Sequence, residues 1–171
     1  GCVIVHDDKI ISIGQTGLKG RPHAETNAIN SSNESLIGAT MYITLEPCNH
    51  YGKTPPCTNQ IIKKKIRKVI FSIEDIDQKV KGKSLKILKS KNIIVKKGLL
   101  SKDIKKFYKP YEINRKRKIP YVTGKIAISK NNFIFSDKNK RITDIYSDKL
   151  THYLRYKNDS LLVTYKTLAK D

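Results

Sequence analysis

Apolar and polar residues alternate along several short stretches of the first hundred residues, with the two-residue period of a half-buried β-strand. Strands are therefore predicted over residues 2–6, 9–14, 39–45, 68–73 and 93–95. Between them the period lengthens to that of a helix, over residues 24–30, from about residue 57, and over residues 84–91. The first two strands predict a hairpin, and the later strands alternate with helices. This order predicts an α/β fold with a mixed sheet and crossover helices.

The pattern changes after Gly98, where a charged helix is predicted over residues 101–118 with an interruption at Pro110. Beyond it, the pattern predicts a strand over residues 120–128, a helix over 144–157 and a strand over 160–164. We therefore expect a first domain over residues 1–100, a linker helix over 101–118 and the incomplete start of a second domain over 119–171. Because the sequence opens inside a strand-like run and stops abruptly, we expect it to be a piece of a longer protein.

The sequence has 35 Lys and Arg residues against 15 Asp and Glu residues, which gives a formal net charge of +20. The lysines are spread through every segment, so the charge indicates a solvated surface, and we expect no nucleic-acid partner. No stretch approaches the ~20 apolar residues of a membrane span, and no signal peptide is recognisable, so we expect a cytoplasmic protein without a membrane partner. Three cysteines in such a chain do not make a disulfide framework, and metal binding is the better use for two of them.

The residues that indicate chemistry are His23, Glu25, Cys48 and Cys57. His23 and Glu25 open a predicted helix, and the two cysteines follow the next predicted strand. One imidazole and two thiolates are a standard ligand set for a catalytic zinc ion, which keeps its fourth position for water. A His-x-Glu motif followed by a Pro-Cys pair is the pattern of zinc deaminases, in which the glutamate lies outside the metal shell. We therefore predict His23, Cys48 and Cys57 as zinc ligands and Glu25 as the proton carrier.

The spacing of His23 and Glu25 sets a condition on the helix that carries them. In mid-helix, two residues that are two apart point about 200° away from each other and share no face. Both side chains can reach one site only if the first turn of the helix points end-on at the metal. In that arrangement Glu25 can take a proton from water and return it to the departing amine.

The segments around these residues resemble the bifunctional riboflavin-biosynthesis deaminase/reductase family. The resemblance rests on His23-Ala24-Glu25 and on residues 44–57, which read Thr-Leu-Glu-Pro-Cys-Asn-His-Tyr-Gly-Lys-Thr-Pro-Pro-Cys. Eight residues (49–56) separate the two cysteines, whereas tRNA and nucleoside deaminases have two between theirs. The resemblance to the family extends to residues 1–5 and 75–82, and to Lys125, Ala127 and Ser129.

This resemblance implies a cytidine-deaminase-like three-layer α/β/α domain, followed by the start of a dihydrofolate-reductase-like α/β domain. It implies zinc-dependent removal of the ring amine from 2,5-diamino-6-(5-phosphoribosylamino)pyrimidin-4(3H)-one, and then reduction of the ribosyl group by NADPH. The residues that match substrate contacts of the deaminase site are His50, Lys53 and Asp75. In the second domain, Arg155 matches a contact to the substrate phosphate, and Ala127, Thr167 and Asp171 match contacts to NADP. The family also implies a homo-oligomer.

The sequence departs from the family pattern at three places. Thr16 occupies the position of a substrate-contacting histidine, residues 75–78 read Asp-Ile-Asp-Gln instead of Asp-Pro-Asn-Pro, and residues 129–132 read Ser-Lys-Asn-Asn instead of Ser-Leu-Asp-Gly. The last departure weakens the match to the cofactor loop. Because most of the dihydrofolate-reductase-like domain is expected to lie beyond Asp171, we expect no reductase activity from these 171 residues alone. Two other hypotheses stay open: a tRNA or nucleoside deaminase with the same metal chemistry, and a purely structural zinc site with His50 as fourth ligand.

Overall fold

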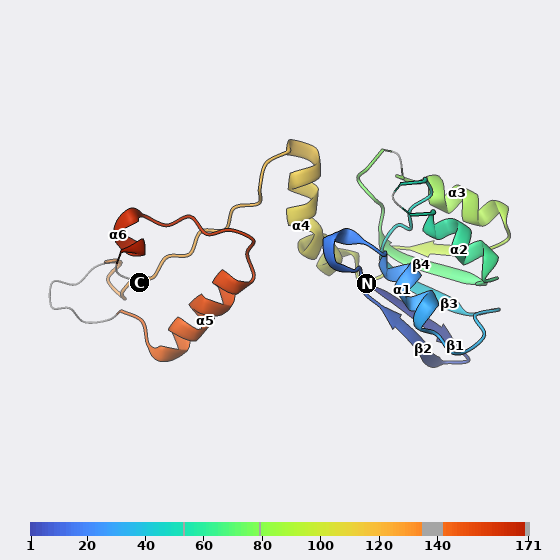
Figure 1. Cartoon of the computed structure of the whole chain (residues 1–171), viewed down its shortest axis with the longest axis horizontal. Helices are drawn as coiled ribbons and strands as arrows, with labels where there is room; N and C mark the ends of the chain where they lie inside the picture. The colour runs from blue at the N-terminus through green and yellow to red at the C-terminus, as the bar shows by residue number, and fades with distance from the viewer. Residues whose placement is uncertain (53, 79, 135–141, 170–171) are drawn as a thin grey trace. The chain divides into compact units, whose positions relative to one another are not determined.

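The computed structural model describes residues 1–52, 54–78, 80–134 and 142–169, and they form two compact units, Gly1–Tyr121 and Val122–Asp171 (Figure 1). The strands, all in the first unit, are β1 Cys2–His6, β2 Lys9–Gly14, β3 Thr40–Leu45, β4 Lys68–Ile73 and β5 Ile94–Lys97. The helices of the first unit are η1 Leu18–Gly20, α1 Ala24–Ser31, α2 Cys57–Lys63, α3 Lys83–Ser90 and α4 Ser101–Arg117. The second unit holds α5 Ile145–Tyr156 and α6 Tyr165–Leu168.

The five strands form one mixed sheet in the order β2-β1-β3-β4-β5. Strand β1 is antiparallel to both of its neighbours, and β3, β4 and β5 are parallel to one another. Asp7 and Asp8, both with positive φ, form the two-residue turn of the β1–β2 hairpin, as the right-handed twist of paired strands requires. The parallel pairs are joined through α2 and α3, because a parallel connection needs a crossover. The predicted hairpin and mixed sheet are confirmed.

The hydrophobic core lies on one face of the sheet. Every second residue of the central strands is buried there, namely Cys2, Ile4, Met41, Ile43, Val69 and Phe71. Helices α1, α2 and α3 supply Ala28, Ile61 and Leu88 to the same cluster. Figure 1 shows these three helices packed along the sheet. The alternating pattern seen in the sequence is therefore the signature of a sheet with one fully covered face.

Helix α4 forms the third layer. Thr44 follows the core residue Ile43 and so points to the other face of the sheet, where its hydroxyl lies 2.9 Å from the Tyr108 hydroxyl of α4. The predicted interruption at Pro110 is wrong, because α4 runs through this residue. Pro110 and Lys106 are both exposed, so water can satisfy the Lys106 carbonyl that loses its helical partner.

Among the described residues, no helix has the length and apolar character needed to cross a membrane.

The second unit differs from the prediction. The helix over 144–157 is confirmed as α5, whose N-cap Asp144 accepts a hydrogen bond of 2.8 Å from the Ser147 N–H. The strands predicted over 120–128 and 160–164 are wrong, since these residues have no regular secondary structure. A strand needs a neighbour for its backbone N–H and C=O groups, and no described residue of this unit pairs with either segment. The dihydrofolate-reductase-like fold of this unit stays a prediction.

Candidate active site

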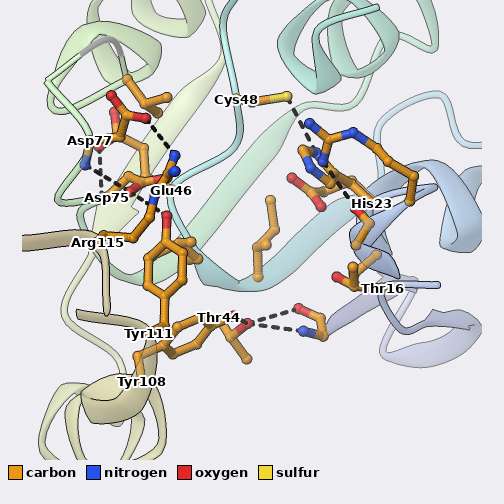
Figure 2. A pocket seen from close by; sticks show the side chains of 18 of the residues that line it. Thr16, His23, Thr44, Glu46, Cys48, Asp75, Asp77, Tyr108, Tyr111 and Arg115 are labelled. Carbon is orange, nitrogen blue, oxygen red and sulfur yellow. Dashed lines mark hydrogen bonds and ion pairs between the residues drawn. The ribbon is translucent and has the colours of Figure 1, made fainter. Parts of the chain in front are cut away.

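The beginning of α1 resolves the spacing of His23 and Glu25. His23 is the N-cap, with extended backbone (φ −67°, ψ 158°), and Glu25 is the second residue of the helix. Because the N-cap is not yet helical, the 200° separation of a mid-helix pair does not apply. Both side chains line the same cavity, which Figure 2 shows with His23 labelled. Pro22 precedes the cap and is therefore not the first helical residue.

The two cysteines are brought to His23 by the segment between β3 and α2. Cys48 lies in the loop after β3, and Cys57 is the first residue of α2. The Cys57 N–H donates to the Cys48 sulfur at 3.3 Å, which fixes the two ends of the loop to each other. The Nδ1 atom of His23 lies 3.3 Å from the Cys57 sulfur and 3.4 Å from the Cys48 sulfur.

These three donor atoms lie within 4.8 Å of one another and fit a metal ion. Zn–N bonds of about 2.0–2.1 Å and Zn–S bonds of about 2.3 Å in a tetrahedron put nitrogen and sulfur about 3.5 Å apart. The pKa of the Cys48 thiol is lowered to about 4, chiefly by a hydrogen bond from Cys57, and the same interaction raises the pKa of the Cys57 thiol. One thiolate thus forms readily, and a cation is needed to stabilise the second.

Glu25 lies beside this group and is 6% exposed. Burial raises the pKa of its carboxyl group above the ordinary value. The carboxylate is thereby a better proton acceptor than an exposed glutamate, which suits a group that moves a proton within a closed site.

The cavity next to these residues has a volume of about 400 Å³, a size suited to a small molecule. Figure 2 shows His23 and Cys48 on one side of it and Asp75, Asp77, Tyr111 and Arg115 across from them. Both sides belong to the first unit.

The other predicted site residues fall into three groups. His50, Asp75 and Thr16 line the cavity, and the Nδ1 atom of His50 is buried without a hydrogen-bond partner among the described residues. Lys53 and Asp171 lie outside the described residues. The remaining three belong to the second unit, where Ala127 lies in an irregular segment, Arg155 in α5 and Thr167 in α6.

Helix α4 contributes residues to the site that were not predicted from the sequence. Tyr108, Tyr111 and Arg115 line the cavity, although their segment was predicted to be a linker. Their spacing of three and then four residues places them on one face of a helix, and this pattern could have indicated them.

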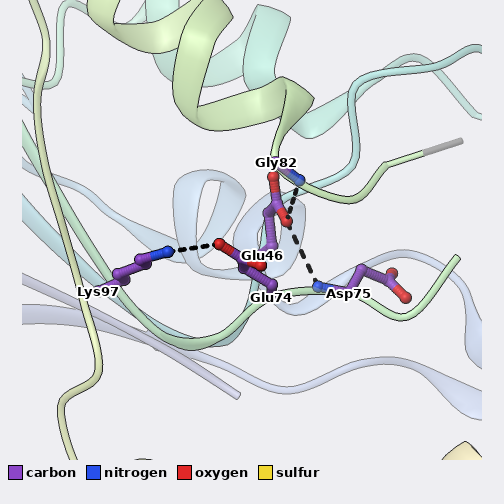
Figure 3. Close-up of polar contacts among 5 residues, drawn as sticks. All are labelled: Glu46, Glu74, Asp75, Gly82 and Lys97. Atoms are coloured by element: carbon purple, nitrogen blue, oxygen red, sulfur yellow. Dashed lines mark hydrogen bonds and ion pairs between the residues drawn. The ribbon is translucent and has the colours of Figure 1, made fainter. Parts of the chain in front are cut away.

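Glu46 was also missed. It is 3% exposed, and its Oε2 atom accepts backbone hydrogen bonds from Gly82 at 3.0 Å and Asp75 at 3.4 Å (Figure 3). Glu46 therefore connects the loop after β3 to the segment that carries Asp75. In the same view, Glu74 forms a 2.6 Å ion pair with Lys97.

A mixed sheet with a histidine at the beginning of α1 and two cysteines between β3 and the beginning of α2 defines the class of zinc-dependent deaminases. Comparison with known proteins agrees, because residues 1–73 match the cytidine and deoxycytidylate deaminase zinc-binding region. The class contains several substrate types, so the relatives of the whole chain decide the family.

The chain is 50% identical over 111 residues to the diaminohydroxyphosphoribosylamino-pyrimidine deaminase of Buchnera aphidicola subsp. Schizaphis graminum, covering 65% of this chain and 76% of the relative. It is 34% identical to the riboflavin biosynthesis protein RibD of Aquifex aeolicus, over 100% of this chain and 49% of that protein. The crystal structure of a diaminohydroxyphosphoribosylaminopyrimidine deaminase/5-amino-6-(5-phosphoribosylamino)uracil reductase from Thermotoga maritima matches with a TM-score of 0.88 and 36% identity, over 99% of this chain and 50% of that one.

The chain belongs to the diaminohydroxyphosphoribosylaminopyrimidine deaminase family, and the predicted family is confirmed. It spans about half the length of the RibD proteins that it matches. The hypothesis of a tRNA or nucleoside deaminase is not favoured by these relatives.

Proposed function

We propose that the first unit catalyses the hydrolytic deamination of 2,5-diamino-6-(5-phosphoribosylamino)pyrimidin-4(3H)-one in riboflavin biosynthesis. The observation that carries this proposal is the convergence of His23, Cys48 and Cys57 at 3.3–3.4 Å beside the buried carboxyl group of Glu25. The names of the relatives supply the substrate class, and the cavity has room for a pyrimidine ring.

In this proposal, metal binding, proton transfer and substrate binding are assigned to different residues of the site. His23, Cys48 and Cys57 hold zinc, which when bound supplies a Lewis acid that makes water nucleophilic at neutral pH. Glu25 accepts the proton of the attacking water and delivers it to the ring amino group as the C–N bond breaks. One water is consumed, a ring carbonyl forms and ammonia leaves. His50 and Asp75 hold the ring, and Lys53, outside the described residues, contacts the phosphoribosyl group.

A second proposal concerns the longer proteins of the family. There, residues 119–171 would begin a reductase domain, after the deaminase domain over 1–100 and the linker helix over 101–118. Its reaction would be NADPH-dependent reduction of the ribosyl group, with Ala127, Thr167 and Asp171 at the cofactor and Arg155 at the substrate phosphate. The names of the longer relatives support this activity.

We also propose that the chain self-associates, since edge strand β2 exposes Ile10 and Ile13.

The decisive experiment compares the native chain with Glu25→Gln in metal analysis and in an ammonia-release assay on the phosphoribosylaminopyrimidine. We expect one zinc per chain in both proteins, and a rate lower by about 10²–10⁴-fold in the variant, because the mutated group carries a proton and is not a ligand. Glu74→Gln is the matched control, since it removes an exposed carboxylate that pairs only with Lys97 among the described residues. Loss of zinc in Glu25→Gln, or an unchanged rate, would contradict the assignment.

A further inference from the structure

One face of α4 forms the wall of the cavity opposite the metal ligands. Tyr108, Tyr111 and Arg115 share this face and line the cavity (Figure 2). The match to the deaminase zinc-binding region ends at residue 73, before this helix and before Asp75. The metal chemistry and the opposite wall are therefore encoded by different parts of the chain.

Tyr111 fixes one carboxylate of this wall. Its hydroxyl donates to the Oδ1 atom of Asp75 at 3.2 Å, and the Asp77 N–H donates to the same oxygen at 2.9 Å. No other described residue forms a hydrogen bond with this carboxylate, so its Oδ2 atom is left for a donor on a bound ligand. The Tyr111 phenol is protonated at neutral pH and can donate, and burial raises its pKa further.

Arg115 acts on the neighbouring carboxylate. Its guanidinium group forms a 2.9 Å ion pair with the Oδ2 atom of Asp77 and lies 5.9 Å from the centre of the Tyr111 ring. The ring and the guanidinium group attract each other at this separation, so the two side chains support one another.

The charges in the cavity explain why this arrangement matters. Four carboxylic acids line it, Glu25, Glu46, Asp75 and Asp77, against the two arginines Arg21 and Arg115. An anionic ligand such as a phosphoribosyl compound is repelled by uncompensated carboxylates in so confined a space. On the side of the cavity that α4 forms, Arg115 offsets the negative charge of Asp77.

We propose that Tyr111 and Arg115 are positioning residues of the deaminase site, through which α4 selects the substrate. Tyr111 orients Asp75 toward N–H groups of the pyrimidine ring, and Arg115 neutralises Asp77 so that an anionic ring substituent is accepted. This inference rests on the proposed function, because it assumes a phosphorylated aminopyrimidine in the cavity. The contacts of Tyr111 and Arg115 are to Asp75, to Asp77 and to each other, and not to the candidate metal ligands or Glu25, so we expect the effect in substrate affinity.

The test uses the full chain loaded with zinc, with Tyr111→Phe, Arg115→Met and Arg115→Lys compared with the native protein. We expect Tyr111→Phe and Arg115→Met each to raise KM about tenfold, because each variant loses one hydrogen bond or ion pair. We expect kcat to stay within about twofold of the native value. Arg115→Lys should bind the substrate more tightly than Arg115→Met, because lysine keeps the positive charge but lacks the two parallel N–H donors of the guanidinium group. For Arg115→Met, the loss is greater with the phosphorylated substrate than with its dephosphorylated form.

Lys116→Met is the matched control on the same helix, since Lys116 pairs with Glu112 and does not line the cavity. We expect its KM to equal that of the native chain. Substrate affinity measured by calorimetry in the Glu25→Gln background should fall by the same factors, which separates binding from turnover. The inference is overturned if the native chain releases ammonia and both KM values stay unchanged, or if they change only together with zinc content or melting temperature. If the native chain releases no ammonia, the proposed function fails, and the positioning role fails with it.

Discussion

Among the candidate ligands, Cys57 is the most completely enclosed, with 1% of its surface exposed. Its sulfur contacts His23 at 3.3 Å and lies 4.0 Å from the Thr26 hydroxyl. Cys2 is buried to a similar degree, at 2%, but it packs in the hydrophobic core from strand β1, and burial is the main cause that raises the pKa of its thiol. Of these two buried cysteines, Cys57 has a histidine beside it, which makes it the candidate metal ligand.

This contrast gives a prediction for metal binding. Cys57→Ala should lower the zinc content to well below one ion per chain, because only two ligands remain and the tetrahedral set is broken. Cys2→Ala, the matched control, removes a buried sulfur without touching the site and should keep a full equivalent of zinc. Metal analysis of both purified variants measures the effect. Equal zinc content in the two variants would show that the ion is bound elsewhere.

At the scale of secondary-structure elements, the site depends on close contact between β2 and α1. A Cβ atom at Gly14 would lie 2.2 Å from the Ala24 carbonyl oxygen and 2.4 Å from the Ala28 nitrogen. Both are backbone atoms of α1, so this helix, which His23 caps, would have to move.

Gly14→Ala should therefore lower the free energy of unfolding by about 3 kcal/mol or more, since overpacking against backbone cannot be relieved by a side-chain rotation. Gly52→Ala is the control, because its nearest neighbour outside the adjacent residues is the end of the Arg21 side chain at 3.7 Å. We expect a change within about 0.5 kcal/mol there. Urea denaturation of the two variants and the native chain measures the difference. A stable Gly14→Ala variant would disprove the close packing.

A second element-scale contact is the buried carboxylate of Glu46, which accepts the backbone N–H groups of Gly82 and Asp75. Glu46→Ala leaves both N–H groups without their acceptor and should cost about 2 kcal/mol or more in unfolding free energy. Glu74→Ala, in the exposed ion pair with Lys97, should cost less than about 1 kcal/mol. Thermal denaturation distinguishes the two, and similar melting temperatures would contradict the role of Glu46.

At the scale of the whole molecule, the two units differ in what they bury. Among the described residues, every buried hydrophobic side chain belongs to the first unit, and none in the second unit is buried. Large apolar side chains such as Val122, Ile126 and Leu162 are mostly exposed there. The candidate ligands, Glu25 and the cavity all lie in the first unit.

A chain of residues 1–121 should therefore fold by itself, bind one zinc ion and release ammonia at a rate within about twofold of the 171-residue chain. The physical reason is that no described residue of the second unit belongs to the hydrophobic core or lines the cavity. Metal analysis and the ammonia assay on the shorter chain check this. Loss of zinc or of activity in the shorter chain would show that residues after 121 support the site.

The sequence determined a large part of the first unit by itself. Strands β1, β2 and β4 have the predicted bounds, because alternating side chains read directly as a sheet with one buried face. His23, Cys48 and Cys57 were selected by residue type and order, since few side chains make zinc ligands. The second unit was predicted less well, because strands at 120–128 and 160–164 require partners that local sequence does not specify.

Tertiary structure alone decided which residues complete the cavity. Tyr111 and Asp75 are 36 positions apart, and so are Glu46 and Gly82, so no local period connects them. From the sequence we expected the first turn of the helix to point end-on at the metal. The structure shows His23 as the N-cap of α1, and this non-helical backbone is what lets His23 and Glu25 line one cavity. Residue chemistry is local and can be read from the chain, whereas a wall assembled from distant segments exists only after the sheet and α4 have packed.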